Sequence, residues 1–163
     1  MAGAAGAIGK IKSETLALEG QKQEASKGRD KLREALSALK NQKNQLQGNL
    51  KHLYSGLDKI NGAISSVKDH PAGVEHPQVA EQLSKLKAQK EQIIGQISYL
   101  KRGIKDIGSR ISDYNEKLMS LNQNIEMIGS AIGARKQALQ QIAGQMAAQI
   151  SLNSNREAGK KKG

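Results

Sequence analysis

The stretch HPAGVEHP, residues 70–77, contains both prolines of this 163-residue chain. Pro71 lacks a backbone N–H and disfavours helical geometry at His70, so it predicts the end of a helix. Pro77 suits the first turn of a following helix, where no N–H is needed. We therefore expect a helix with a short N-terminal arm at residues 1–69, a loop at 70–77, a second helix at 78–155 and a flexible basic tail at 156–163.

Hydrophobic residues on both sides of this loop recur in alternating steps of three and four. The first series begins Ile8, Ile11, Thr15, Leu18 and ends at Val67; the second begins Val79, Leu83, Leu86, Lys90 and ends at Gln149. Of these 39 positions, here called the seam, 32 are apolar, against about 14 if the 37% hydrophobic content were scattered at random. This heptad period predicts an all-α fold: a long two-helix antiparallel coiled-coil hairpin with a left-handed supercoil.

Five basic residues interrupt the seam: Lys22, Arg29, Lys43, Lys90 and Arg135. A turn near Gly73 would place residue i roughly opposite residue 147 − i, so that Lys43 faces Ile104 and Lys22 faces Ile125. No acidic seam residue faces them, and long basic side chains reach from a two-stranded seam into water. We expect these residues to set register or to be tolerated, with a basic partner-binding stripe as the alternative.

The faces outside the seam are rich in small residues. With Leu36 assigned to heptad position a, six of the nine outermost f positions of the first helix are Gly or Ser. Glycine inside a helix costs nearly 1 kcal/mol relative to alanine, so the pattern predicts close lateral packing of helices. The alternatives are relaxed selection on a solvated face and hinges in a long helix. The predicted assembly face consists of Gly20, Gly28, Gly48, Gly56, Gly62, Gly103, Gly108, Gly129 and Gly133.

The composition excludes several protein classes. Cys, Trp and Phe are absent, which rules out a disulfide scaffold and thiolate chemistry. No apolar run has the length of a membrane span or of a signal-peptide core. We expect a cytoplasmic protein by default, with leaderless export to the extracellular space left open. The 26 basic and 15 acidic residues give a net charge of +11, which indicates mild attraction to polyanions or anionic surfaces.

The predicted loop and tail are candidate contact sites. His70, Val74 and His76 lie in the irregular segment, so we expect the tip of the hairpin to contact a partner or simply to be solvated. The two histidines have no spacing typical of a metal site, and we expect no metal. The tail is a candidate anion-binding site, with a solubilising role as the alternative: Arg156, Lys160, Lys161 and Lys162.

We expect no enzymatic activity, cofactor or small-molecule substrate, because there is no GxSxG, HExxH, P-loop or CxxC motif. The leading hypothesis is a structural protein, a homo-oligomer that assembles laterally into a bundle, tube or filament. The first alternative is a stalk or adaptor of a larger protein assembly that docks through the hairpin tip or the terminal end. The second alternative is a module that binds nucleic acid, another polyanion or a membrane surface.

A basic two-helix hairpin of this length is similar to the stalk proteins of flagellar and type III export machines, which insert into a ring-shaped ATPase. The resemblance covers the architecture of the whole chain and transfers no functional residue. The absence of Cys, Trp and Phe, together with abundant Ala, Gln, Ser, Asn and Gly, also resembles self-assembling axial proteins that bacteria export without a signal peptide.

Overall fold

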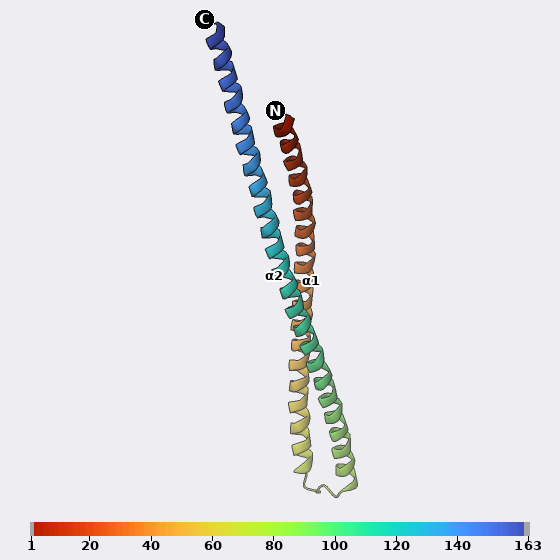
Figure 1. The fold of residues 1–163 in the computed structure, drawn as a ribbon. Helices are drawn as coiled ribbons and strands as arrows, with labels where there is room; N and C mark the ends of the chain where they lie inside the picture. Colours follow the sequence, from red (N-terminus) through yellow and green to blue (C-terminus); the bar gives the residue numbers. More distant parts are fainter. Residues whose placement is uncertain (1, 162–163) are drawn as a thin grey trace. The chain divides into compact units, whose positions relative to one another are not determined.

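A computed structural model describes residues 2–161, and these residues form two long α-helices. Helix α1 spans Ala2–Lys68 and helix α2 spans Pro77–Lys161, joined by residues 69–76 (Figure 1). The two helices pack against each other, so the all-α hairpin predicted from the prolines is confirmed. Met1, Lys162 and Gly163 lie outside the described residues.

The helices extend further toward both chain ends than the sequence predicts. Helix α1 already begins at Ala2, where a short arm is expected. Helix α2 continues through Arg156 to Lys161, where a tail is expected. No proline follows Pro77, and Gly159 weakens a helix without forbidding it, which explains the continuation.

The loop consists of consecutive turns closed by backbone hydrogen bonds. The His70 N–H donates to Val67 O (3.2 Å), the Gly73 N–H to His70 O (3.0 Å) and the His76 N–H to Gly73 O (3.2 Å). Gly73 has a φ of 79°, a left-handed conformation that glycine adopts without strain. His76 acts as the N-cap of α2, because its Nδ1 accepts a hydrogen bond from the Gln78 N–H (3.3 Å).

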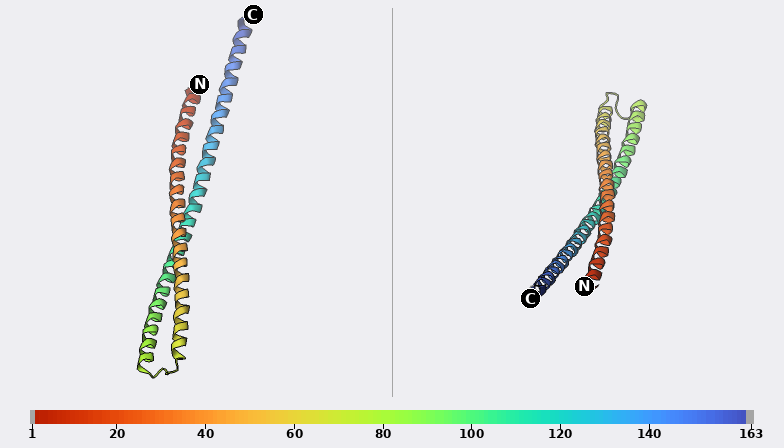
Figure 2. Two further views of the ribbon diagram at one scale, coloured as in Figure 1. Left: turned by 180° about the vertical axis from the view of Figure 1, so that it is seen from behind. Right: turned by 90° about the horizontal axis from the view of Figure 1, so that it is seen from above.

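The chain divides into two compact units, each containing a segment of both helices. The loop unit comprises residues 33–116 and includes the 69–76 loop; the terminal unit comprises residues 1–32 and 117–163. In the loop unit the α1 and α2 segments lie side by side in all views and run antiparallel (Figure 2). In the terminal unit the start of α1 likewise packs against an antiparallel segment of α2, where Glu14 pairs with Arg135 and Gly28 lies beside Leu121.

The buried residues of both units coincide with the predicted seam. Every seam residue is buried or half-buried except Lys22 and Gln149, which are exposed. The most buried side chains of the loop unit are Leu36, Ile64, Val79, Ile97 and Ile107; those of the terminal unit are Thr15, Ile125 and Ile132. The Thr15 hydroxyl donates to the Ile11 carbonyl (2.7 Å), so its burial leaves no hydrogen bond unmade.

The helices face each other in a register that differs from the predicted one. The numbers of facing residues add to 149 for Gly28 and Leu121 in the terminal unit, and to 149 for Leu46 and Gly103 in the loop unit. For Lys43 and Gly108 they add to 151. A sum near 150 places a positions of one helix opposite d positions of the other, whereas a sum of 147 does not. The register therefore follows the pairing of seam residues and not a turn centred on Gly73.

Among residues 2–161, no helix is both long and apolar enough to cross a membrane.

Candidate interaction surfaces

Two sides of the helix pair flank the seam, and they differ in composition. The g side contains the heptad g positions of both helices, and the e side contains the e positions. On the g side, seam side chains pack against glycines of the opposite helix. A Cβ built on Gly56 would lie 3.8 Å from Ile93 Cδ1, and one built on Gly103 would lie 3.8 Å from Leu46 Cδ1, both ordinary van der Waals distances.

On the e side, glycines lie beside seam lysines. A Cβ built on Gly108 would lie 3.9 Å from Lys43 Nζ in the loop unit, and one built on Gly129 would lie 3.8 Å from Lys22 Nζ in the terminal unit. The ammonium groups therefore leave the seam past a residue that has no side chain. This is the snorkelling expected from the sequence, but next to different neighbours than Ile104 and Ile125.

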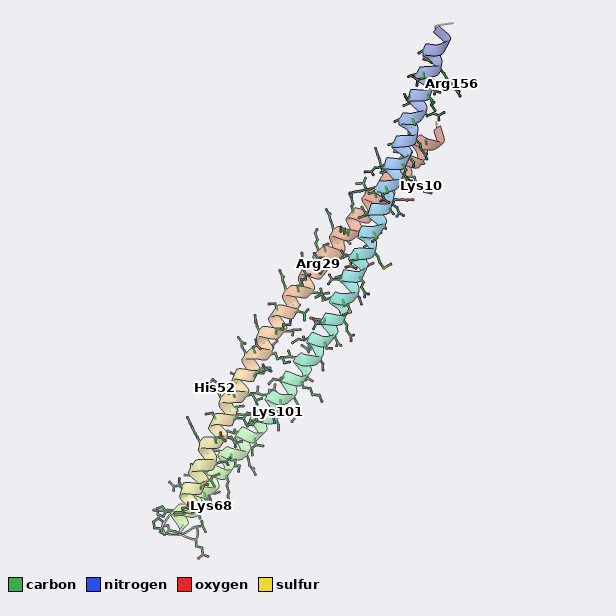
Figure 3. All side chains as sticks on the ribbon, turned by 90° about the vertical axis from the view of Figure 1, so that its left-hand side faces the viewer. Lys10, Arg29, His52, Lys68, Lys101 and Arg156 are labelled. Atoms are coloured by element: carbon green, nitrogen blue, oxygen red, sulfur yellow. The ribbon has the colours of Figure 1, made fainter. Side chains whose placement is uncertain are left out.

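The e side of the loop unit is strongly basic. Its e positions contain five basic residues and no acidic one: Arg33, Lys40, Lys68, Lys87 and Lys101. Two seam lysines add to them. Lys43 emerges on this side at Gly108, and the same register places the half-buried Lys90 beside Asn61, another e residue. We call these seven residues the basic stripe; Figure 3 labels Lys68 at the end of α1 and Lys101 on α2.

Two partly exposed apolar side chains interrupt the basic stripe near its middle. Tyr54 of α1 is 38% exposed and Ile94 of α2 is 45% exposed, and the register brings these two e positions to the same level of the loop unit. Lys101 Nζ lies 5.5 Å from the centroid of the Tyr54 ring, within cation–π range. The stripe thus combines cations with an aromatic ring and an aliphatic side chain.

The g positions of the loop unit are almost uncharged, and this side is hollowed into a groove whose lining also includes Arg102 and Asp106. Of its ten g positions only Arg110 is charged; the others are Gln, Asn, Ala or Gly. Two adjoining depressions share Tyr99 and Leu100, and their floor includes the seam residues Leu46, Leu53, Leu100 and Ile107. We call this hollow the g-side groove. Tyr99, 75% exposed, stands at its edge.

The predicted assembly glycines do not share one face. Gly28, Gly56 and Gly103 line the g side next to seam side chains, and Gly108 and Gly129 line the e side next to lysines. Gly20, Gly48, Gly62 and Gly133 have no neighbouring atom within 4 Å of an added Cβ. At all nine positions an alanine methyl fits within one copy of the chain, so packing inside the hairpin does not demand glycine there.

The predicted tip residues are held in the loop by local hydrogen bonds. His70 Nδ1 accepts from the Ala72 N–H (3.1 Å), as His76 Nδ1 does from the Gln78 N–H. Each histidine therefore shapes a backbone turn through its Nδ1 atom. Val74, 47% exposed, is the apolar side chain that the loop presents to solvent.

The C-terminal end of α2 extends past its partner helix within the terminal unit. Because facing residue numbers add to about 150, the first residue of α1, Ala2, lies opposite residue 148 of α2. Figure 1 shows α2 continuing beyond this start of α1. We call residues 149–161 the overhang. It exposes Ile150 (54%) and Leu152 (58%) and carries the predicted anion-binding residue Arg156. The side chains of Lys160 and Lys161 are not described, and Lys162 lies outside the described residues.

Ion pairs cross between the helices in the terminal unit. Arg135 Nε lies 3.1 Å from Glu14 Oε2, and Lys136 Nζ lies 3.8 Å from Glu19 Oε1. Among the described residues of the loop unit, by contrast, no stripe residue forms an ion pair with an acidic side chain. Basic residues of the terminal unit thus form ion pairs between the helices, whereas the basic stripe forms none within the described loop unit, although the total charge is spread over the whole chain.

Comparison with known proteins finds no match: no family model, curated protein or solved structure is significantly similar to this chain. The interaction surfaces therefore rest on the geometry of this chain alone. The sequence offered a basic partner-binding stripe as an alternative for the seam residues, among them Lys43 and Lys90. The cations at the e positions and the g-side groove were not predicted as surfaces, because the prediction rested on the f positions and the small residues at g. Comparing charges at the e and g positions would have found both.

Proposed function

We propose that this protein is a non-enzymatic structural protein whose copies pack side by side as left-handed coiled-coil hairpins. One observation carries the proposal: among the described residues, no side chain is fully buried. A seam of only two helices leaves its leucines and isoleucines partly in contact with water. Further helices packed against the hairpin would remove that apolar surface from water, at about 25 cal/mol per Å².

The g-side groove is the surface best suited to receive a second copy. Its floor contains seam hydrophobic residues, and its walls contain Gln and Asn side chains with Gly95 and Gly103 between them. Arg102, Asp106 and Arg110 line the part of the groove beside Ile107. Small residues let a second backbone approach closely, and among the described residues no Lys, Arg, Asp or Glu lines the depression that contains Asn49 and Gln96, so identical basic chains can meet there without repulsion. Amide side chains donate and accept hydrogen bonds, so two identical walls complement each other.

Light scattering over a hundredfold range of concentration tests this proposal. The protein should form particles well above the chain mass of 17.5 kDa and grow with concentration. The double variant Asn49→Lys/Gln96→Lys puts two charges into the groove walls and should abolish growth. The matched control, Gln47→Lys/Asn61→Lys, makes the same exchanges at exposed e positions and should assemble normally.

A wild-type chain of constant mass over this range would contradict lateral assembly. Equal loss of growth in both double variants would show that net charge, and not the groove, controls association. Circular dichroism melting of each variant establishes that the helices still form, so that a loss of assembly is not mistaken for unfolding.

A stalk or adaptor is the second candidate, and the overhang favours it. Ile150 and Leu152 are exposed on a helical segment that has no partner within the terminal unit. A protein that docks through this end would capture one partner from its own cell extract and would lose it when Ile150 and Leu152 become Ser. Replacing residues 70–76 with a plain turn tests the tip in the same way.

A further inference from the structure

We propose that the basic stripe binds the headgroups of anionic lipids and holds the loop unit against a membrane surface. This surface is distinct from the g-side groove and does not depend on lateral assembly. The stripe is formed by e positions and seam lysines, whereas the groove is formed by g positions on the other side of the seam.

The charge of the loop unit is concentrated on this side. Residues 33–116 include 13 basic and 9 acidic residues, a net charge of +4. The stripe alone contributes seven positive charges and no negative one, so the remainder of the unit has a net charge of −3. An anionic surface would therefore attract the e side more than the rest of the unit, which orients the unit as well as binding it.

The stripe cations are free to meet an external anion. Arg33, Lys40, Lys68, Lys87 and Lys101 are exposed, and no ion pair within the described loop unit neutralises them. Gly108 leaves room for the ammonium group of Lys43 to join them. With facing residue numbers near 150, the stripe cations of α2 and the two seam lysines fall between Arg33 and Lys68 of α1, so the cations of both helices together form one row on the e side.

Tyr54 and Ile94 favour lipid over nucleic acid as the partner. Both side chains lie within the row and are 38% and 45% exposed. A tyrosine ring and an aliphatic side chain are favourable at the headgroup level of a bilayer, where cations bind the phosphates around them. The phosphates of a duplex follow a helical path that a row parallel to the helix axis meets only at intervals, and a duplex offers no apolar layer for Ile94.

Co-sedimentation with vesicles tests the proposal. The full chain should bind phosphatidylcholine vesicles that contain about 30% phosphatidylserine, and not phosphatidylcholine alone, with affinity that falls as salt rises. The charge reversal Lys40→Glu/Lys101→Glu should weaken binding at least about tenfold. The matched control, Lys59→Glu/Lys85→Glu, changes the net charge equally at positions outside the stripe and should stay within about twofold of the wild type.

The contribution of Tyr54 and Ile94 to vesicle binding can be measured separately from that of the cations. Tyr54→Gln/Ile94→Gln keeps every charge and should weaken vesicle binding about fivefold or more while leaving retention on duplex DNA unchanged. The groove variant Asn49→Lys/Gln96→Lys should still bind vesicles, which separates this proposal from lateral assembly. Melting curves confirm that each variant is folded.

Three outcomes would overturn the lipid assignment. The first is equal binding to neutral and anionic vesicles. The second is an equal loss of affinity in the stripe and control reversals, which would make the interaction one of net charge alone. The third is stripe-dependent retention on duplex DNA without binding to anionic vesicles, which would assign the surface to nucleic acid.

Discussion

Lys43 and Gly108 form a matched pair across the helices of the loop unit: a Cβ on Gly108 would lie 3.9 Å from Lys43 Nζ. The pair Lys22 and Gly129 repeats the arrangement in the terminal unit at 3.8 Å. A lysine at a seam position is compatible with the fold here because its ammonium group leaves the seam beside a residue without a side chain. Each of these seam lysines therefore depends on the glycine beside it, which leaves space for the ammonium group.

Replacing Lys43 with Leu should stabilise the protein by about 1–2 kcal/mol, because an apolar side chain fills the seam position without an ammonium group to hydrate. Urea unfolding followed by circular dichroism measures the change. Gly108→Leu fills the exit path, so it should cost stability in the Lys43 chain and much less in the Lys43→Leu chain. Additive effects of the two substitutions would contradict the pairing.

Glycines on the helices and in the loop should respond oppositely to alanine. Gly62→Ala places a methyl group in open space on a helix and should stabilise by nearly 1 kcal/mol. Gly73→Ala forces a φ of 79° on a residue with a side chain and should destabilise by about 1 kcal/mol. Thermal melting of the two variants checks the opposite signs, and two shifts of the same sign would contradict the account of the loop.

His76→Ala should destabilise the protein by about 1 kcal/mol, because the Gln78 N–H loses its acceptor at the start of α2. His76→Asp restores an acceptor at the N-cap and should recover that stability. Hydrogen exchange of the Gln78 amide provides a local readout, with faster exchange in His76→Ala. Unchanged exchange would mean that the imidazole does not cap the helix in solution.

The ion pair between Glu14 and Arg135 should contribute little to stability. Its side chains are 40% and 36% exposed, so solvent screens the attraction, and about 0.5 kcal/mol is expected. A double-mutant cycle with Glu14→Gln and Arg135→Gln measures the coupling energy. The coupling should shrink as salt is added, and a coupling above about 2 kcal/mol would indicate a far less solvated pair.

The secondary structure and buried residues were predictable because each depends on a local rule. Pro71 and Pro77 set the helix ends near the loop, and the three-four spacing identifies the buried side chains. The register was mispredicted because a turn centre does not determine it; only sums that join a with d positions satisfy the packing. The basic stripe follows from which side of the seam each charge occupies, so the heptad assignment of each helix would have shown its e-position cations, whereas the level at which Tyr54 meets Ile94 depends on the register.

Within residues 2–161, charges are paired between the helices in the terminal unit and unpaired on the basic stripe of the loop unit, so a change in ionic strength should shift the stabilities of the two units in opposite directions. Salt weakens the crossing ion pairs of the terminal unit, such as Arg135 with Glu14, and also relieves the mutual repulsion of the unpaired cations on the basic stripe. Amides near Glu14 should therefore exchange faster as salt is raised, while those near Lys40 and Lys101 exchange more slowly. Counterions alone would thus change which end of the hairpin opens first, before any partner binds.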